Sequence, residues 1–159
     1  MKEAEAFRSV MSHFATGVTV LTGADPEGTP VGLTANSFTS VSLDPPLVLV
    51  CVSNDSTSRS AILETGRFAI SVLRREDEPL SRRFAGPTRE IRFDDLVLRR
   101  AATGAPILER SLAWLDCTLW KVVEAGDHSV LFGRVEACGV TGDGAPLVFF
   151  QGQYRTVAE

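Results

Sequence analysis

The order of strand-like and helix-like segments restricts the fold of this chain more than any other sequence feature. About eight segments have the composition of strands, and only a few short ones have helical periodicity. The strand-like segments follow one another in pairs joined by turns such as Asp25–Gly28, instead of alternating with helices. This order argues against a doubly wound parallel sheet. It predicts a mainly β fold, in which an antiparallel barrel closes on itself and helices pack on its outside.

Helical periodicity is clearest near the start of the chain. Apolar residues stand there at i, i+3, i+4 and i+7, namely Phe7, Val10, Met11 and Phe14. We therefore expect a helix over residues 3–15, ended by Gly17 in the left-handed conformation. Two shorter helices are expected over residues 60–65 and 76–84.

The predicted strands differ in their pattern. They span residues 18–22, 31–34, 37–43, 47–52, 67–73, 112–123, 129–140, 147–150 and 153–156. The run Leu47–Val52 is apolar at every position, which is typical of a central strand buried on both faces. Trp114 and Trp120 are expected on one face of their strand, in the core or at a subunit interface. Residues 86–106 are rich in charge, Pro and Gly, so we expect a mostly irregular excursion there.

Composition and charge exclude several classes of protein. Apolar residues make up 44% and charged residues 23%, which is ordinary for a globular chain, and we expect a single domain over residues 1–159. The net charge is −4 without a basic stripe, which argues against nucleic-acid binding. The charged start and the short longest apolar run, Leu47–Val52, argue against a signal peptide and a membrane span, so a cytoplasmic protein is expected.

The cysteines and the missing motifs narrow the chemistry further. Cys51, Cys117 and Cys138 form no CxxC pair, so we expect buried structural thiols and no metal site. The chain has no GxGxxG or P-loop pattern and no HExxH or GxSxG pattern. Its two histidines, His13 and His128, have no cysteine or serine nucleophile near them in sequence, which leaves little support for a hydrolase.

A polar run at a strand start is the first candidate site. It consists of Thr34, Ala35, Asn36, Ser37 and Phe38. Small Ala35 lets backbone N–H groups approach a planar ligand, while Asn36 and Ser37 offer donors and acceptors. Such a mixture suits the pyrimidine edge of a flavin. The alternative is ordinary turn chemistry at a strand end.

Two further segments have the composition of a phosphate site. The first contains Ser53, Asn54, Thr57, Ser58 and Arg59 ahead of a helix, and the second is Ser81–Ala85, with Arg82, Arg83 and Phe84. Hydroxyls, helix N-terminal N–H groups and arginines together bind phosphate. The alternatives are that Thr57 or Ser58 only caps the helix, and that Phe84 lies in the core below a solvated helix face.

Gly126, Asp127 and His128 form the turn of the last long hairpin. A histidine beside an acid can simply be a solvated turn, or it can bond a nicotinamide carboxamide or supply a proton. Tyr154 near the end of the chain is a candidate to flank the same cleft, or it is part of a closing strand.

Taken in order, these segments resemble the short flavin reductase family, the reductase components of two-component flavin-dependent monooxygenases. The resemblance covers nearly the whole chain. It runs through Phe14–Val20, Gly32–Phe38, Ser40–Leu47, Ser56–Ser58, Phe84–Ala85, Gly126–His128 and Gly152–Tyr154. It implies an FMN-binding split barrel with Greek-key topology, usually a homodimer with flavin near the subunit interface.

The resemblance also implies roles for individual residues. Thr34, Ala35, Asn36, Ser37 and Phe38 would line the flavin ring. Ser53, Asn54, Thr57 and Ser58 would hold the ribityl chain and phosphate, and Arg83, Phe84 and Ala85 would lie near the phosphate or adenine end. His128 would meet the nicotinamide, with Tyr154 at its flank.

The expected activity is hydride transfer from NADH or NADPH to FMN or FAD, which supplies reduced flavin to a partner monooxygenase. Such a transfer needs proximity and orientation more than an acid or base, which agrees with the lack of a catalytic triad. Three alternatives stay open: a split-barrel flavoenzyme acting directly on an organic substrate, a non-catalytic flavin-binding or haem-binding module, and a structural dimerisation protein.

Overall fold

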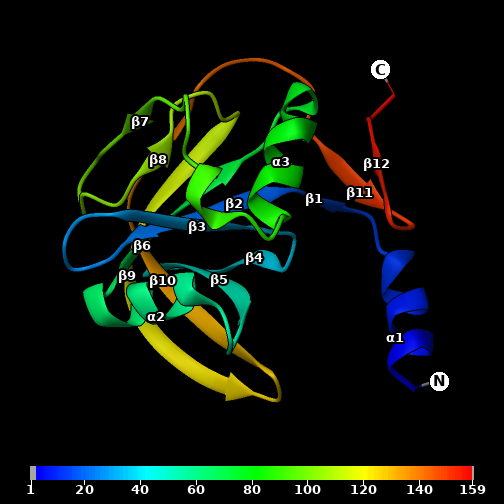
Figure 1. Cartoon of the computed structure of the whole chain (residues 1–159), viewed down its shortest axis with the longest axis horizontal. Helices are drawn as coiled ribbons and strands as arrows, with labels where there is room; N and C mark the ends of the chain where they lie inside the picture. The colour runs from blue at the N-terminus through cyan, green and yellow to red at the C-terminus, as the bar shows by residue number, and fades with distance from the viewer. Residues whose placement is uncertain (1–2, 159) are drawn as a thin grey trace.

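The fold is dominated by antiparallel strands. A computed structural model describes residues 3–158 (Figure 1). The strands of the main sheet are β2 (Thr19–Ala24), β3 (Pro30–Ala35), β4 (Phe38–Leu43), β5 (Pro46–Ser53), β6 (Arg67–Val72), β9 (Ala113–Ala125) and β10 (His128–Val140). They hydrogen-bond in the order β3-β2-β6-β9-β10-β5-β4, and every pairing is antiparallel. This arrangement agrees with the predicted mainly β fold.

Shorter elements surround this sheet. The remaining strands are β1 (Thr16–Gly17), β7 (Leu98–Arg99), β8 (Ile107–Leu108), β11 (Val148–Phe150) and β12 (Gln153–Arg155). The helices are α1 (Glu3–Ser12), α2 (Thr57–Thr65) and α3 (Glu78–Ala85), with single 3-10 turns η1 (Arg75–Asp77) and η2 (Arg89–Ile91). The predicted irregular excursion is confirmed, since η2 and β7 are its only regular elements among the described residues. No helix between residues 3 and 158 is both long and apolar enough to cross a membrane.

The two edge strands of the barrel are connected by the chain itself and not by a ladder of backbone hydrogen bonds. β3 and β4 are the two edges of the sheet, yet Asn36 and Ser37 alone separate them in the chain. The sheet therefore curls until its edges meet at these two residues, which we call the seam. The expectation of a barrel closed on itself is wrong in this detail, because no β3–β4 pairing exists.

Apolar side chains from both halves of the sheet fill the barrel. Phe68 and Leu131 are fully buried there, together with Leu21, Val50 and Ile62. A second cluster forms below α3, where Phe84 is completely buried. The two clusters fix the barrel and hold α2 and α3 against it.

β5 departs from the prediction for Leu47–Val52. It lies next to the edge strand β4, and its side chains alternate between buried and half-buried. Val48, Val50 and Val52 point into the core, while Leu49 and Cys51 are only partly covered. The prediction of a strand buried on both faces is therefore wrong for the isolated chain.

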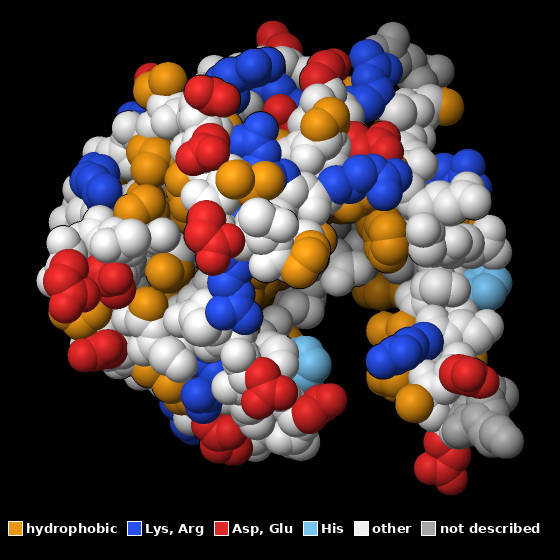
Figure 2. Space-filling model, viewed as in Figure 1, with side chains coloured by type: hydrophobic (Ala, Val, Ile, Leu, Met, Phe, Trp, Pro, Cys, Tyr) orange, Lys and Arg blue, Asp and Glu red, His pale blue; other side chains and the backbone are white. Residues whose placement is uncertain are grey.

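Helix α1 stands apart from the barrel beside β11 and β12 (Figure 1). It ends at Ser12 instead of residue 15, and Gly17 belongs to β1 instead of capping the helix. None of its residues is buried. Its apolar stripe is exposed, with Phe7 at 66%, Val10 at 69% and Met11 at 48% of full exposure. Figure 2 shows a deep hollow between α1 and the barrel, with hydrophobic atoms on the α1 side.

The tryptophans and the cysteines differ among themselves in burial. Trp114 is buried against Ala105 and Ile107, whereas Trp120, at a bulge in the β9–β10 ladder, is half exposed. The core position is confirmed for Trp114, and a subunit interface at Trp120 stays a prediction. Cys117 is buried as expected, and burial, with the negative charge of Asp116 second, raises its pKa to about 12. Cys138 is exposed, which contradicts the expectation of a buried thiol.

Candidate functional site

The seam residues are held in place by side-chain hydrogen bonds. Asn36 donates from Nδ2 to the hydroxyl oxygen of Thr16 at 3.2 Å. Ser37 donates its hydroxyl to the carbonyl oxygen of Cys51 at 2.8 Å, which ties the seam to β5. A two-residue link with both side chains fixed in this way presents a rigid edge to whatever lies beside it.

A cavity of about 660 Å³ lies beside the seam, between it and the residues that lead from α1 into β2. We call it the seam cavity. Apolar and polar side chains share its wall: Met11, Phe14, Ala15, Thr16, Gly17, Val18, Thr19, Asn36, Ser37, Phe38, Thr39, Leu49, Cys51 and Val72. An apolar wall with a few fixed polar groups is typical of sites for flat organic ligands.

Only part of the predicted flavin-ring segment, residues 34–38, lies at the seam cavity. Asn36, Ser37 and Phe38 line the seam cavity. Ala35 is buried, and its carbonyl oxygen accepts the hydroxyl of Thr19 at 2.6 Å. Thr34 lies on the other side of the seam.

A second cavity, of about 370 Å³, lies where Thr34 faces the loop after β5. We call it the arginine cavity. Hydroxyls and two arginines dominate its polar wall, which consists of Leu33, Thr34, Ser53, Asp55, Ser56, Thr57, Phe84, Ala85, Arg89 and Arg92. It also lies at the N-terminus of α2, where free N–H groups favour an anion.

The two cavities are neighbours along the same two strands. On the β3 side, Thr34 and Asn36 line different cavities, and on β5, Cys51 and Ser53 do so. Two residues along an extended strand span about 7 Å. A ligand with a flat ring in the seam cavity therefore needs only a short linker to place an anionic group in the arginine cavity.

Arg92 fixes positive charge at the arginine cavity. Its Nη1 donates to the carbonyl oxygen of Gly32 at 2.7 Å, and its Nη2 donates to that of Gly86 at 2.6 Å. Its Nε is buried and has no hydrogen-bond partner among residues 3–158. Burial, and then the charge of Arg89, lower the pKa of Arg92. Two neighbouring cations in a cavity with one acid, Asp55, suit a phosphate.

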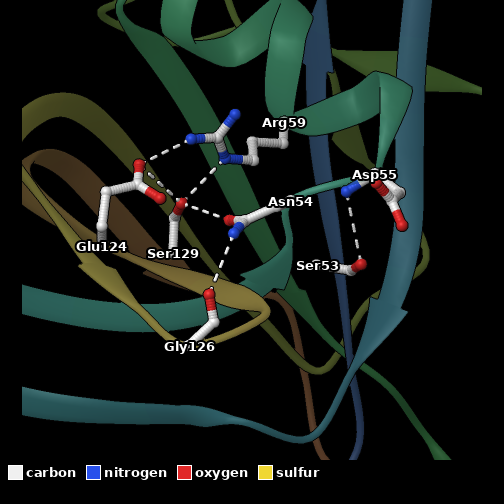
Figure 3. A network of polar contacts seen from close by, with 7 residues as sticks. All are labelled: Ser53, Asn54, Asp55, Arg59, Glu124, Gly126 and Ser129. Atoms are coloured by element: carbon white, nitrogen blue, oxygen red, sulfur yellow. Dashed lines mark hydrogen bonds and ion pairs between the residues drawn. The ribbon is translucent and has the colours of Figure 1, made fainter.

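The predicted phosphate loop is only partly placed at this cavity. Ser53 and Thr57 line it, whereas the side chain of Ser58, in the first turn of α2, is buried. The cap of α2 is Ser56, whose hydroxyl oxygen accepts the N–H of Arg59 at 3.4 Å, so the expected caps Thr57 and Ser58 are wrong. Asn54 faces away, toward the β9–β10 hairpin (Figure 3).

The second predicted phosphate segment, Ser81–Ala85, also lies only partly at the arginine cavity. Arg83 donates to the carbonyl oxygen of Asp94 at 2.8 Å and lines a different cavity, of about 420 Å³, on the far side of α3. Phe84 packs edge-on against Phe93 with ring centres 5.0 Å apart, and it borders the arginine cavity together with Ala85.

Sequence reasoning missed Arg89 and Arg92 as candidate phosphate ligands. Both belong to the local excess of arginines between Arg74 and Arg92, which was a usable signal. The excess alone did not indicate which of these arginines face a cavity, because α3 turns Arg83 to its opposite side.

The predicted histidine turn lies directly against the loop after β5. The N–H of Asn54 donates to the carbonyl oxygen of Asp127 at 3.0 Å, and His128 pairs with Ser53 across the ladder. The Nδ1 of His128 lies 2.7 Å from Oδ1 of Asp127, and the ring is about half exposed, at 47%. The hydrogen bond and charge of His128 lower the pKa of Asp127.

Tyr154 lies outside both cavities in this chain. Its hydroxyl is 2.7 Å from Oγ of Ser81, and the guanidinium of Arg82 lies 4.8 Å above its ring. The carbonyl oxygen of Ser81 in turn accepts the hydroxyl of Thr34 at 2.6 Å. Tyr154 therefore anchors the C-terminal hairpin to α3 and, through it, to β3.

An antiparallel barrel split at a short seam, with a ring-sized cavity and an anion-suited cavity side by side, defines a split-barrel protein of the flavin-binding class. Comparison with known proteins specifies the family. The model of the flavin reductase like domain matches residues 11–158, and the chain belongs to this family. The resemblance and the split-barrel fold expected from the sequence are both confirmed.

Individual relatives agree with this assignment. An NADH-dependent flavin reductase of Rhodococcus sp. is 45% identical over 152 residues, which are 94% of this chain and 84% of that protein. The reductase subunit of a flavin-dependent monooxygenase from Rhodococcus jostii is 42% identical, over 95% and 76% of the two chains. The NADH:FAD oxidoreductase of Streptomyces globisporus C-1027, solved with NAD and FAD fragments, has a TM-score of 0.91 at 36% identity, over 99% and 94%.

Some relatives are much longer than this chain. The chain spans only 42% and 57% of two reductases from Rhizobium meliloti, and 48% of a monooxygenase reductase component from Acinetobacter baylyi. It therefore corresponds to about half of each of these proteins.

Proposed function

We propose that this chain is an NAD(P)H:flavin oxidoreductase, which transfers a hydride from NADH or NADPH to FMN or FAD. The observation that supports it most directly is the pair of adjacent cavities on the barrel seam. One cavity suits a flat ring, and the other suits a phosphate. Family membership and the similarity to an NADH-dependent flavin reductase support the same activity.

The seam cavity would hold the flavin ring. Phe38, Leu49 and Val72 give it apolar surface, and the side chains of Asn36 and Ser37 lie at its polar edge. The hydroxyl proton of Ser37 is committed to the carbonyl oxygen of Cys51, so its oxygen faces the ligand as an acceptor.

The arginine cavity would hold the flavin phosphate. Ser53, Ser56 and Thr57 offer hydroxyls, and the first turn of α2 offers N–H groups. Arg92 supplies charge that its bonds to two backbone carbonyls keep in place, while Arg89 is exposed and can close on the phosphate.

A bound flavin would supply the redox chemistry, as the acceptor of a hydride, which carries two electrons. The protein then needs to bind the two rings face to face and to exclude misaligned encounters. We assign the nicotinamide carboxamide to His128, whose imidazole is held by Asp127 at the edge of the β5 loop.

The test is a titration of the purified protein. Oxidation of NADH and NADPH is followed at 340 nm with no flavin, riboflavin, FMN and FAD in turn. We expect oxidation to depend on flavin, and the ranking gives the preferred pair. Oxidation that needs an organic substrate instead would support a direct-acting flavoenzyme. Flavin binding without oxidation would leave a non-catalytic binding module, and neither result is compatible with the proposal.

We further propose that the reduced flavin is delivered to a flavin-dependent monooxygenase. The support is the similarity to the reductase subunit of such an enzyme from Rhodococcus jostii. Without a partner, reduced flavin reacts with oxygen, so we expect NADH consumption to be matched by hydrogen peroxide. An added flavin-dependent monooxygenase with its substrate should lower that peroxide yield.

A homodimer is proposed from the apolar surface that the single chain leaves uncovered. The apolar side chains of α1 and of Phe14 just after it are exposed, and Met11 and Phe14 also border the seam cavity. The outer face of β5 and β10 is half-buried and apolar at Leu49 and Phe132. A second copy that covers this surface would also complete the wall of the seam cavity.

Val10 gives a clean test of the dimer. Its side chain is 69% exposed and lines neither the seam cavity nor the arginine cavity, so Val10→Asp should leave the fold intact. We expect light scattering to show a dimer for the wild type and a monomer for Val10→Asp. Val97→Asp, at an equally exposed apolar site away from α1, is the control and should stay dimeric. A monomeric wild type would contradict the proposal.

The predicted single domain and cytoplasmic location stay predictions.

A further inference from the structure

We propose that Asn54 is a positioning residue which couples the phosphate loop to the hairpin that holds His128. The inference rests on the proposed function, because it connects the sites proposed for the two substrates. Sequence reasoning expected Asn54 to contact the flavin itself. The structure instead places its side chain between the loop after β5 and the β9–β10 hairpin (Figure 3).

Both ends of the Asn54 amide are engaged by the protein. Its Nδ2 donates to the carbonyl oxygen of Gly126 at 3.2 Å. Its Oδ1 accepts the hydroxyl of Ser129 at 2.8 Å. An amide with a donor and an acceptor already bonded to the hairpin is a connector between segments and not a free ligand group.

Ser129 extends this connection to α2. It is completely buried, and its oxygen accepts Nε of Arg59 at 2.8 Å. Arg59 also bonds Glu124 of β9 at 2.8 Å. Because the serine hydroxyl has one proton, it donates either to Asn54 or to Glu124, which lies farther away at 3.1 Å. Figure 3 shows these residues converging on Ser129 from α2, β9 and the loop.

The same loop reaches His128 through its backbone. The N–H of Asn54 donates to the carbonyl oxygen of Asp127 at 3.0 Å, and the carboxylate of Asp127 lies 2.7 Å from His128. The loop residues on either side of Asn54, Ser53 and Asp55, line the arginine cavity. A phosphate that orders this loop therefore also orders the turn on which His128 stands.

Coupling of this kind follows from preorganisation. A polar network that converges on a buried hydroxyl, here that of Ser129, and has all its partners present restricts the segments it joins to one arrangement. The ligand that binds first then orders both segments, and the second ligand loses less entropy on binding. Since linkage is reciprocal, each ligand should tighten the other by the same factor.

Comparing FMN with riboflavin isolates the phosphate, because both carry the same ring. NAD⁺, which cannot reduce the flavin, is titrated calorimetrically into protein saturated with either one. For the wild type we expect NAD⁺ to bind at least about fivefold more tightly with FMN than with riboflavin. For Ser129→Ala we expect this difference to fall below about twofold. Ser111→Ala is the control, because Ser111 is likewise a buried serine and its hydroxyl donates to the carbonyl oxygen of Leu108 at 3.0 Å, away from the loop and the hairpin.

A second pair of variants separates positioning from a general loss of stability. Glu124 is an exposed partner, so its replacement should leave the fold intact. Glu124→Ala should reduce the FMN advantage, and Glu124→Gln, which keeps the acceptor oxygen, should retain more of it. Circular dichroism confirms that each variant is folded.

His128 itself gives a readout that is independent of activity. The chain has two histidines, so the imidazole resonances of His13 and His128 are readily assigned. In the wild type, FMN should shift the His128 resonance further than riboflavin does. In Ser129→Ala, the two flavins should shift it by the same amount. His13 serves as the internal reference.

Two results would overturn the coupling: equal NAD⁺ affinity with FMN and riboflavin in the wild type, or an undiminished difference in Ser129→Ala. Failure of the proposed function looks different, because the wild type would then not oxidise NADH with any flavin. A wild type that binds no flavin at all would refute both.

Discussion

Nδ1 of His128 lies 2.7 Å from the carboxylate of Asp127, at the tip of the hairpin between β9 and β10. A proton on Nδ1 is donated to this carboxylate, which leaves Nε2 turned away from Asp127. The contact orients the imidazole without burying it, since 47% of the side chain is exposed. His128 is therefore both accessible to a second ligand and restrained in direction.

Removing the imidazole should affect the nicotinamide more than the flavin. We expect His128→Ala to raise the KM for NADH about fivefold, the equivalent of one hydrogen bond, while the flavin dissociation constant changes less than twofold. Steady-state rates and flavin fluorescence titrations measure the two quantities. Equal losses in both, or in neither, would refute the assignment of His128 to the nicotinamide.

Asp127 should titrate at lower pH than a free aspartate. His128, by its hydrogen bond and then its charge, lowers the pKa of the Asp127 carboxyl below its ordinary value of 3.8. A lowered pKa in the folded state stabilises the protein above that ordinary value, and this stabilisation is lost as the pH falls through the lowered pKa. Carboxyl NMR measures the shift, and in His128→Ala we expect the pKa of Asp127 to return toward 3.8. An unchanged pKa in that variant would show that the pair does not form.

Arg89 and Arg83 should differ in how much they contribute to binding the phosphate of FMN. We expect Arg89→Ala to weaken FMN binding by about tenfold, as for a lost charged hydrogen bond, and riboflavin binding by less than twofold. Arg83→Ala is the matched control, because Arg83 faces another cavity and should leave both affinities unchanged. Fluorescence quenching of each flavin measures the affinities. An effect of Arg83→Ala larger than that of Arg89→Ala would restore the sequence-based assignment.

Gly133 should be intolerant of any side chain. A Cβ there would collide with the ring of Phe68 and would lie 2.9 Å from Cβ of Cys117. Both neighbours are fully buried, so Gly133→Ala should cost about 1–3 kcal/mol of unfolding free energy. Gly17→Ala, where nothing lies within 4 Å, is the control and should unfold like the wild type in urea. Equal midpoints for both variants would mean that the core adapts at Gly133.

The order of hairpins and turns predicted the antiparallel fold, because three ladders of the main sheet, β2–β3, β4–β5 and β9–β10, join strands that follow one another in the chain. The ladders β2–β6, β6–β9 and β5–β10 join distant segments, which no local pattern indicates. The helix predicted over residues 60–65 ends where α2 does, and Gly66 caps it with a left-handed φ of 71°. The sequence was misleading where an apolar run is left uncovered in the single chain. The apolar runs at Leu47–Val52 and along α1 indicated burial, but a single copy leaves Leu49 half-buried and Val10 exposed.

The candidate site was predictable in its segments and less so in its side chains. Asn36 and Thr57 face cavities, as their surroundings in sequence indicated. Asn54 and Arg83 do not face the predicted site, because partners more than ten residues away in the chain decide their direction. Neither the hydroxyl of Ser129 nor the carbonyl of Asp94 is visible to local pattern reasoning.

The seam at Asn36 and Ser37 has a consequence for how the protein would release its ligand. The edges of β3 and β4 meet there without a ladder of backbone hydrogen bonds, and both cavities open beside that gap. A molecule that spans the two cavities bridges the gap, so the occupied protein should exchange its β3 and β4 amide hydrogens more slowly and melt at a higher temperature. Release of the ligand and loss of local stability between β3 and β4 would then occur together. A barrel with a complete ladder of hydrogen bonds at this place would not couple ligand release to its own stability.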